Sequence, residues 1–189
     1  MSHGQADAGV ASNAYRLLWA GFMAILAAGV GFAIRGGILD NWGVEFGFTG
    51  SQLGAIGGAG FTGFCFGIII GGVIADRADR RKMLTWSQYI QAFSAFALAA
   101  VVFWDVVTIW HVLALSFISG LGQAFGGPAY QSLLPSLVPR RDLPNAIALN
   151  STQFNLSRIL GPMGGTAILV SLGMAACFFL NGLSFFLVI

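Results

Sequence analysis

The chain has 189 residues, of which 57% are hydrophobic and only 8% are charged, and its formal net charge is +2. This composition excludes an ordinary water-soluble domain, in which about 45–50% of residues are apolar. The small net charge offers no basic surface of the kind that binds nucleic acid. Cys65 and Cys177 lie within apolar stretches, so we interpret them as small hydrophobic residues rather than as a disulfide or a metal-binding pair.

Apolar stretches of membrane-spanning length, about 20 residues, recur along the chain. They predict an all-α membrane protein with one bundle of six transmembrane helices, over residues 15–39, 51–75, 83–104, 108–134, 143–170 and 173–189. Residues 1–14 are mostly small and polar and predict a disordered tail. The fold class is therefore a single helical membrane bundle.

The basic residues predict the orientation of this bundle. Seven of the nine Lys and Arg residues lie near the N-terminus, between the second and third spans, or between the fourth and fifth: Arg16, Arg77, Arg80, Arg81, Lys82, Arg140 and Arg141. The loops on the other side carry acidic residues such as Asp40 and Asp105. Because positive charges stay on the cytoplasmic side, we expect a multi-pass protein of the cell (inner) membrane with a cytoplasmic N-terminus.

The second span carries small residues along one face, with Gly63, Gly67 and Gly71 at four-residue spacing. Such faces let two helices approach closely in lipid, where no hydrophobic effect joins them. Two interpretations remain open, a seam within the bundle and a dimerisation motif, and the general occurrence of small faces at helix contacts favours the seam.

Six charged residues crowd into the seven positions from Asp76 to Lys82, a short predicted turn between the second and third spans. Asp76 ends one helix while Arg80 and Arg81 begin the next, so opposite charges face each other across the turn. Such a cluster can latch two helices in one conformation and release them in another. The alternative is a topology anchor that holds the loop in the cytoplasm, although that rule gives little weight to the interleaved acids.

The fifth span contains a charge at mid-membrane depth, Arg158, which shares one helical face with Asn155 and in part with Ser151. Intramembrane charges are functional candidates by default, and a polar face must look into a cavity or towards a partner helix. A structural hydrogen bond of Arg158 to carbonyl groups or to an acid remains the alternative. Gln153 on the same helix is a weaker candidate.

Three further residues are candidates outside the fifth span. Arg35 lies towards the outer end of the first span, where snorkelling to the interface, with Asp40 as a partner, is favoured over a substrate contact. Gln123 and Tyr130 are polar positions of the fourth span and weaker candidates for a cavity wall.

Three stretches resemble the major facilitator superfamily. The run Gly72-x-x-Ala75-Asp76-Arg77-x-x-Arg80-Arg81-x-x-Leu84 resembles its loop signature, with Asp79 where many members have Gly. Residues 120–150 are similar to the passage from helix 4 to helix 5 in the drug and siderophore exporter branch, and "NLSRILGPMGG" at 155–165 resembles the antiporter motif of helix 5.

This resemblance implies the six-helix N-terminal half of an exporter, with a cavity lined by helices 1, 2, 4 and 5. It implies a conformational latch at Gly72, Asp76, Arg77, Arg80 and Arg81. It also implies a bend in helix 5 that accompanies proton-coupled export, at Gly161, Pro162 and Gly165, and substrate contacts from the cavity-lining candidates Arg158, Asn155, Gln153, Arg35, Gln123 and Tyr130.

No enzymatic constellation is visible in the chain. It has no Gly-rich phosphate loop ending in Lys-Ser/Thr, no cluster of His or Cys ligands and no Ser-His-Asp set. We therefore expect no enzyme, no metal and no cofactor.

The resembled carriers use two six-helix bundles related by an axis along the membrane normal. One bundle leaves the polar face of the fifth span against lipid, which is costly. The favoured hypothesis is a half-size secondary transporter that exports a small organic molecule as a homodimer or with a second half. The alternatives are a non-transporting membrane interaction or assembly module and a truncated half of a longer carrier.

Overall fold

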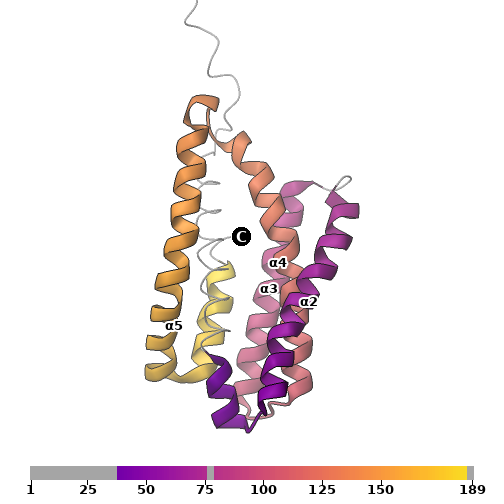
Figure 1. The fold of residues 1–189 in the computed structure, drawn as a ribbon, viewed down its shortest axis with the longest axis vertical. Coiled ribbons are helices and arrows are strands. Elements are labelled where there is room, and N and C mark those ends of the chain that lie inside the picture. The colour runs from indigo at the N-terminus through magenta and orange to yellow at the C-terminus, as the bar shows by residue number, and fades with distance from the viewer. Residues whose placement is uncertain (1–37, 76–78, 187–189) are drawn as a thin grey trace, which may run out of the picture.

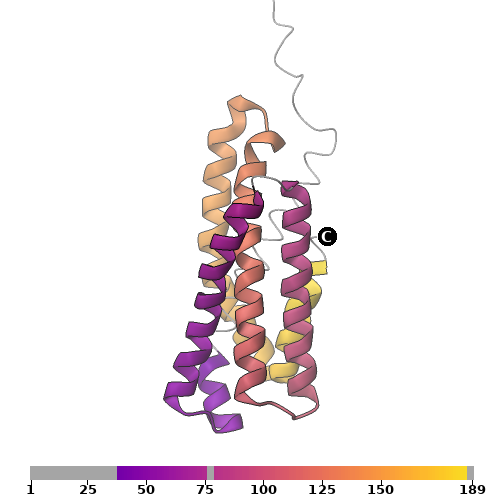
Figure 2. The same ribbon diagram turned by 90° about the vertical axis from the view of Figure 1, so that its right-hand side faces the viewer.

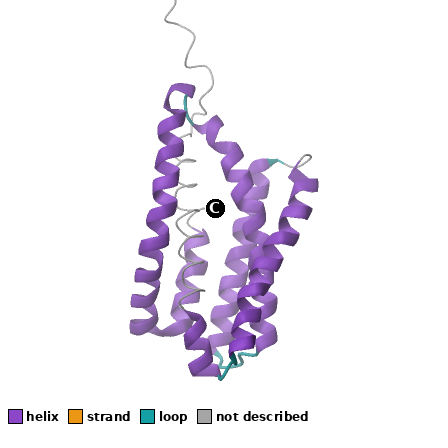
Figure 3. Cartoon of the chain, in the orientation of Figure 1, coloured by secondary structure: helices purple, strands orange, loops and turns teal. Residues whose placement is uncertain are grey.

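The computed structural model describes residues 38–75 and 79–186, and this part of the chain is helical with no strand (Figures 1 and 3). Its long helices are α2 (Gly50–Ala75), α3 (Arg80–Phe103), α4 (Ile109–Leu137) and α5 (Leu143–Phe186), with the short 3-10 helix η1 (Arg140–Asp142) before α5. All four run along the long axis of the molecule (Figure 1). They are long and apolar enough to cross a membrane.

The first predicted span lies almost wholly outside the described residues, so the number of six spans stays a prediction. Where the sequence predicted a loop after residue 39, residues 38–46 are helical. Ile38, Trp42 and Phe46 follow one another at four-residue spacing, and Trp42 is only 4% exposed. Burial of this apolar face explains why the helix continues beyond the predicted boundary.

The helix α5 folds back on itself at Gly173. This residue has φ 83° and ψ 175°, a conformation that only glycine adopts without strain. The chain before it runs towards one end of the molecule, and the chain after it returns alongside α3 (Figure 1). We call residues 143–172 the first arm of α5 and residues 174–186 its returning arm.

The glycine face of α2 packs on α4, so α4 lies between α2 and α3 (Figure 2). A Cβ atom at Gly63 would overlap the backbone of Phe117, and one at Gly67 would lie 2.5 Å from the Cβ of Ala124. Gly120 of α4 stands equally close to the backbone of Gly60. The interpretation of this face as a seam within the bundle is confirmed, because α4 occupies it.

The helix α3 buries polar side chains together with mostly small apolar ones and exposes large aromatic ones. It buries Ser87, Gln88, Gln91 and Ser94, and it exposes large aromatic side chains, Trp86, Tyr89, Phe93 and Phe103. A helix in water has the opposite arrangement. In lipid, polar side chains turn inward to find partners and apolar ones face the hydrocarbon, so α3 has the amphipathicity of a membrane helix.

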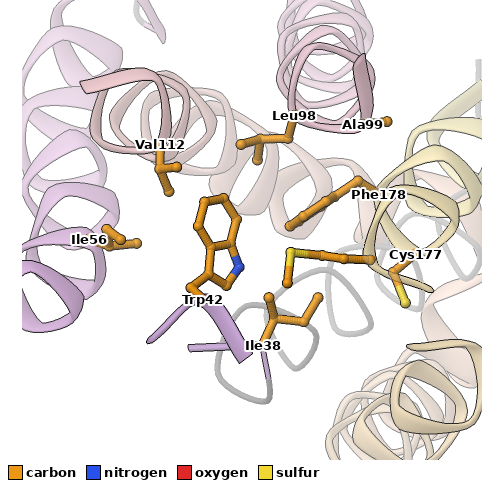
Figure 4. Packing of buried hydrophobic residues seen from close by; sticks show 9 residues of the cluster. Ile38, Trp42, Ile56, Leu98, Ala99, Val112, Cys177 and Phe178 are labelled. Atoms are coloured by element: carbon orange, nitrogen blue, oxygen red, sulfur yellow. The ribbon is translucent and has the colours of Figure 1, made fainter. Parts of the chain in front are cut away.

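The largest group of buried apolar side chains lies at the end of the bundle where α3 ends, α4 begins and α5 turns (Figure 4). Trp42 is its centre and contacts the ring of Phe178 edge-on, with centroids 6.0 Å apart. Of the described helices, α5 packs mainly on α3 and hardly on α4. The first arm of α5 therefore stands apart from α4 along most of its length.

The seam between α2 and α4 predicts a sharp difference between two glycines of the same helix. Gly63→Ala should lower stability by about 1–3 kcal/mol, because the added methyl group has no space beside Phe117. Gly58→Ala is the matched control, since a Cβ there has no heavy atom within 4 Å. Thermal unfolding in detergent measures both, and equal midpoints for the two variants would contradict the seam.

Candidate functional site

The first arm of α5 carries two stripes of residues that differ in exposure. Gln153, Ser157, Gly161 and Gly165 repeat every fourth residue and are buried. The Ser157 hydroxyl donates to the Gln153 carbonyl at 2.9 Å, and the Cys177 thiol of the returning arm lies 3.5 Å from the Gly165 carbonyl. This buried stripe is the packing face of the arm.

The other residues from 151 to 164 are exposed, and Ser151, Asn155, Arg158 and Pro162 form a second stripe among them. Asn155 Nδ2 donates to the Ser151 carbonyl at 2.9 Å, and the amide oxygen of Asn155 takes no part in this hydrogen bond. Arg158 lies midway between the start of α5 and the turn at Gly173, about 22 Å from each at 1.5 Å per residue. The structure thus groups Asn155, Arg158 and Ser151 on one face and places Gln153 on the other.

The guanidinium group of Arg158 contacts an aromatic ring. Its central carbon lies 6.0 Å from the centroid of the Phe154 ring, at the outer limit of a cation–π interaction. Within the described part of the chain, the one ion pair joins Arg141 to Asp142, so Arg158 has no carboxylate partner there. A charge at this depth costs about 2.5–3.5 kcal/mol on insertion scales, and one ring contact offsets only part of that cost.

The proposed bend of α5 has its proline on the exposed stripe and its glycines on the buried one. Gly161 and Gly165 are buried, whereas Pro162 is exposed. Proline has no N–H group, so the carbonyl of Arg158, four residues earlier, lacks its usual helical donor. The polar stripe therefore combines a cationic side chain with a carbonyl oxygen that the helix does not satisfy.

The other substrate-contact candidates are not gathered around Arg158. Tyr130 is buried and Gln123 half-buried on α4, which hardly contacts α5 among the described elements. Arg35 lies outside the described residues. A role for these three residues in binding stays a prediction.

The charge cluster is described in part, because residues 76–78 lie outside the described ranges. Gly72 is helical in α2, and α3 begins at Arg80. Arg80 Nη1 donates to the carbonyl of Ser132 on α4 at 3.3 Å, a contact that the sequence did not predict. This hydrogen bond joins the start of α3 to the last turns of α4.

Asp79 has a local role that the sequence analysis missed. Its Oδ1 accepts from the backbone N–H of Arg81 at 2.9 Å, so it is the N-cap of α3. An aspartate directly before a predicted helix is a recognised start signal, and it was available in the sequence. Asp79 therefore stabilises the start of α3, and this role is independent of any function of the charge cluster.

Comparison with known proteins agrees with this architecture. Residues 10–189 match the family described as transmembrane secretion effectors, which belongs to the major facilitator superfamily. Macrolide efflux protein A of Enterococcus faecalis is 33% identical over 91 residues, which are 48% of this chain and 28% of that protein.

Two transporters of aromatic acids match longer segments. The 4-hydroxybenzoate transporter PcaK of Pseudomonas aeruginosa is 26% identical over 169 residues, 89% of this chain and 37% of the relative. The gallate transporter of Pseudomonas putida is 25% identical over 152 residues, 80% of this chain and 33% of the relative.

The matched segment of the chain thus covers between 28% and 37% of the length of these relatives. The family and the relatives are transporters and not enzymes. With its long apolar helices, the chain is a multi-pass membrane protein. It belongs to the transmembrane secretion effector family, in the exporter branch of the major facilitator superfamily.

Proposed function

We propose that the chain forms one half of a secondary transporter that exports a small organic molecule across the cell (inner) membrane by alternating access. The observation that carries this proposal is the exposed polar stripe of α5, with Arg158 at mid-membrane depth. A polar face at that depth is stable only beside a water-filled cavity or a partner. The cytoplasmic N-terminus expected from the basic loops belongs to the same proposal.

The partner in this proposal is a second six-helix bundle, either a second copy of this chain or another half. Among the described elements, the first arm of α5 hardly contacts α4 and exposes its polar stripe, so it can serve as one wall of a cavity. A second bundle facing this arm would enclose the path between the two halves.

Arg158 favours an anionic substrate. Its guanidinium has no carboxylate partner in the described part of the chain, and a carboxylate ligand would supply the missing acceptors. Two relatives are named for aromatic acids, 4-hydroxybenzoate and gallate, whereas another is named for macrolides. The exposed ring of Phe154 beside Arg158 suits an aromatic ligand better than an aliphatic one.

The conformational latch in this proposal lies at the turn between α2 and α3 and comprises Gly72, Asp76, Arg77, Arg80 and Arg81. The hydrogen bond from Arg80 to the Ser132 carbonyl ties the start of α3 to α4 in the conformation described. Rearrangement of α4 against α3 would break this bond, and Asp76 and the arginines of the turn would then exchange partners. Asp76, the nearest acid at the end of α2, is the proposed acidic member of the latch.

The second bundle is tested by the oligomeric state. In nanodiscs, native mass spectrometry should show the protein as a homodimer or bound to a second six-helix half, and proteoliposomes of that assembly should transport the substrate. A stable monomer that binds and transports substrate by itself would contradict the proposal.

The latch is tested by charge removal at two positions of the same turn. Asp76→Asn should reduce the transport rate about tenfold or more with little loss of folded protein, because breaking a charged hydrogen bond shifts the conformational equilibrium by about 1.5–3 kcal/mol. Asp79→Asn removes the same charge but keeps an N-cap acceptor, so it should transport normally. Unchanged transport by Asp76→Asn would leave the cluster as a topology anchor.

The anion preference is tested at Arg158. Arg158→Gln should weaken the uptake of benzoate roughly 10- to 100-fold and that of benzamide little, since a hydrogen bond to a charged group contributes about 1.5–3 kcal/mol. Arg158→Lys should keep part of the benzoate affinity. Competition assays in proteoliposomes measure these effects. Equal loss for both compounds, together with a lower melting temperature, would assign Arg158 to the structural framework.

A further inference from the structure

The exposed stripe of α5 offers two different hydrogen-bonding groups at one position. The guanidinium of Arg158 is a donor that is always charged, and the carbonyl of the same residue is an acceptor without its helical donor, because Pro162 has no N–H group. Both Arg158 and Pro162 are exposed, so the carbonyl between them lies on the exposed stripe. Next to it, the side chains of Asn155 and Ser157 donate to the carbonyls of Ser151 and Gln153 and not to that of Arg158.

The two groups point in opposite directions along the helix. The guanidinium leans back towards Phe154, one turn before it. The carbonyl of any helical residue points forward, here towards Pro162 and the turn at Gly173. The donor and the acceptor are therefore about one helical turn apart, on the order of 5–6 Å along the axis.

We infer that Arg158 and Pro162 together form a two-point site for an organic anion that carries a hydroxyl or amine donor about one helical turn from its acid group. The acid binds the guanidinium, and the donor binds the carbonyl that Pro162 leaves unsatisfied. In other transporters, backbone carbonyls that lack helical partners line the cavity and coordinate the transported ions. This inference rests on the proposed function, and it adds a role for Pro162 besides the bend.

The ring of Phe154 adds a third element of recognition. It is half exposed and lies beside the guanidinium, so a flat ligand can pack on it while its acid is held. A benzene ring separates substituents at opposite positions by about the required length, whereas neighbouring substituents are too close to reach both groups. The position of the donor on the ligand is therefore part of the prediction.

Calorimetric titration of the protein in nanodiscs with four probes tests the site. Para-hydroxyphenylacetate has both groups at the required separation, and ortho-hydroxyphenylacetate has them too close. Phenylacetate lacks the hydroxyl, and para-hydroxyphenylacetamide lacks the charge. The wild-type protein should prefer the para-hydroxy acid to phenylacetate and to the ortho isomer by about 3- to 10-fold, the contribution of one neutral hydrogen bond.

Two substitutions of Pro162 separate the carbonyl from the bend. Pro162→Ala and Pro162→Gly both restore the N–H group that occupies the Arg158 carbonyl, but they differ in helix stiffness. Both should lose the preference for the para-hydroxyl group and keep the preference for the acid over the amide. Gly164→Ala stiffens the same turn without touching that carbonyl, since a Cβ there has no heavy atom within 4 Å, and it should keep both preferences.

Several outcomes overturn the inference and leave the proposed function standing. They are a wild-type protein that binds none of the probes or shows no hydroxyl preference, Pro162 variants that keep that preference, and a Gly164→Ala variant that loses it. Thermal unfolding in detergent identifies a variant that fails to fold, in which case the other Pro162 variant decides. Absence of transport by the assembled wild-type protein would instead contradict the proposed function, whatever the probes bind.

Discussion

The contact between α2 and α4 is the one on which the rest of the described structure depends. In lipid, two apolar helices gain nothing by leaving the solvent, so their association requires close backbone approach and van der Waals contact. Gly63 and Gly120 allow that approach because neither has a side chain to hold the backbones apart. With α2 fixed on one side of α4, the other side is free to receive the polar face of α3. The bundle is therefore assembled around α4.

The position of α5 follows from this order of packing. The returning arm packs on α3 through aromatic rings, such as Phe96 against Phe179 at 5.5 Å between centroids, and so fixes the turn at Gly173. The first arm is then carried to the edge of the described bundle, where it keeps one buried stripe and one exposed stripe. The exposure of Arg158 is thus a consequence of how the returning arm is anchored.

Much of this arrangement was predictable from the sequence, because some residues leave only one structural solution. The small face of α2 predicted a close helix contact, and the structure identifies α4 as the partner. The span ending near residue 170 and the next beginning at Gly173 predicted the reversal, since glycine adopts the positive φ that the turn requires. The spacing of small residues and the boundaries of the apolar stretches were sufficient for these two predictions.

The rest depended on contacts between distant residues. The buried polar face of α3 has the spacing of a helix, but nothing in its own sequence says that Gly122 and Gly126 of α4 leave room for it. The hydrogen bond from Arg80 to Ser132 joins residues that are 52 positions apart, and a backbone carbonyl has no sequence signature. The helix at 38–46 extends past its predicted end because Trp42 finds a core made of α2, α3, α4 and α5.

The exposed stripe of α5 also bears on how a carrier of this kind couples its substrate to its conformational change. Before a second bundle closes over the stripe, water can satisfy both the guanidinium of Arg158 and the carbonyl left by Pro162. Closure without a ligand would remove that water from the guanidinium of Arg158 and from its carbonyl. Burying either group without a hydrogen-bond partner costs free energy. A ligand that satisfies both groups removes this penalty. In the proposed carrier, the two groups that would bind the substrate would therefore also oppose closure without it, which would link occupancy to transport.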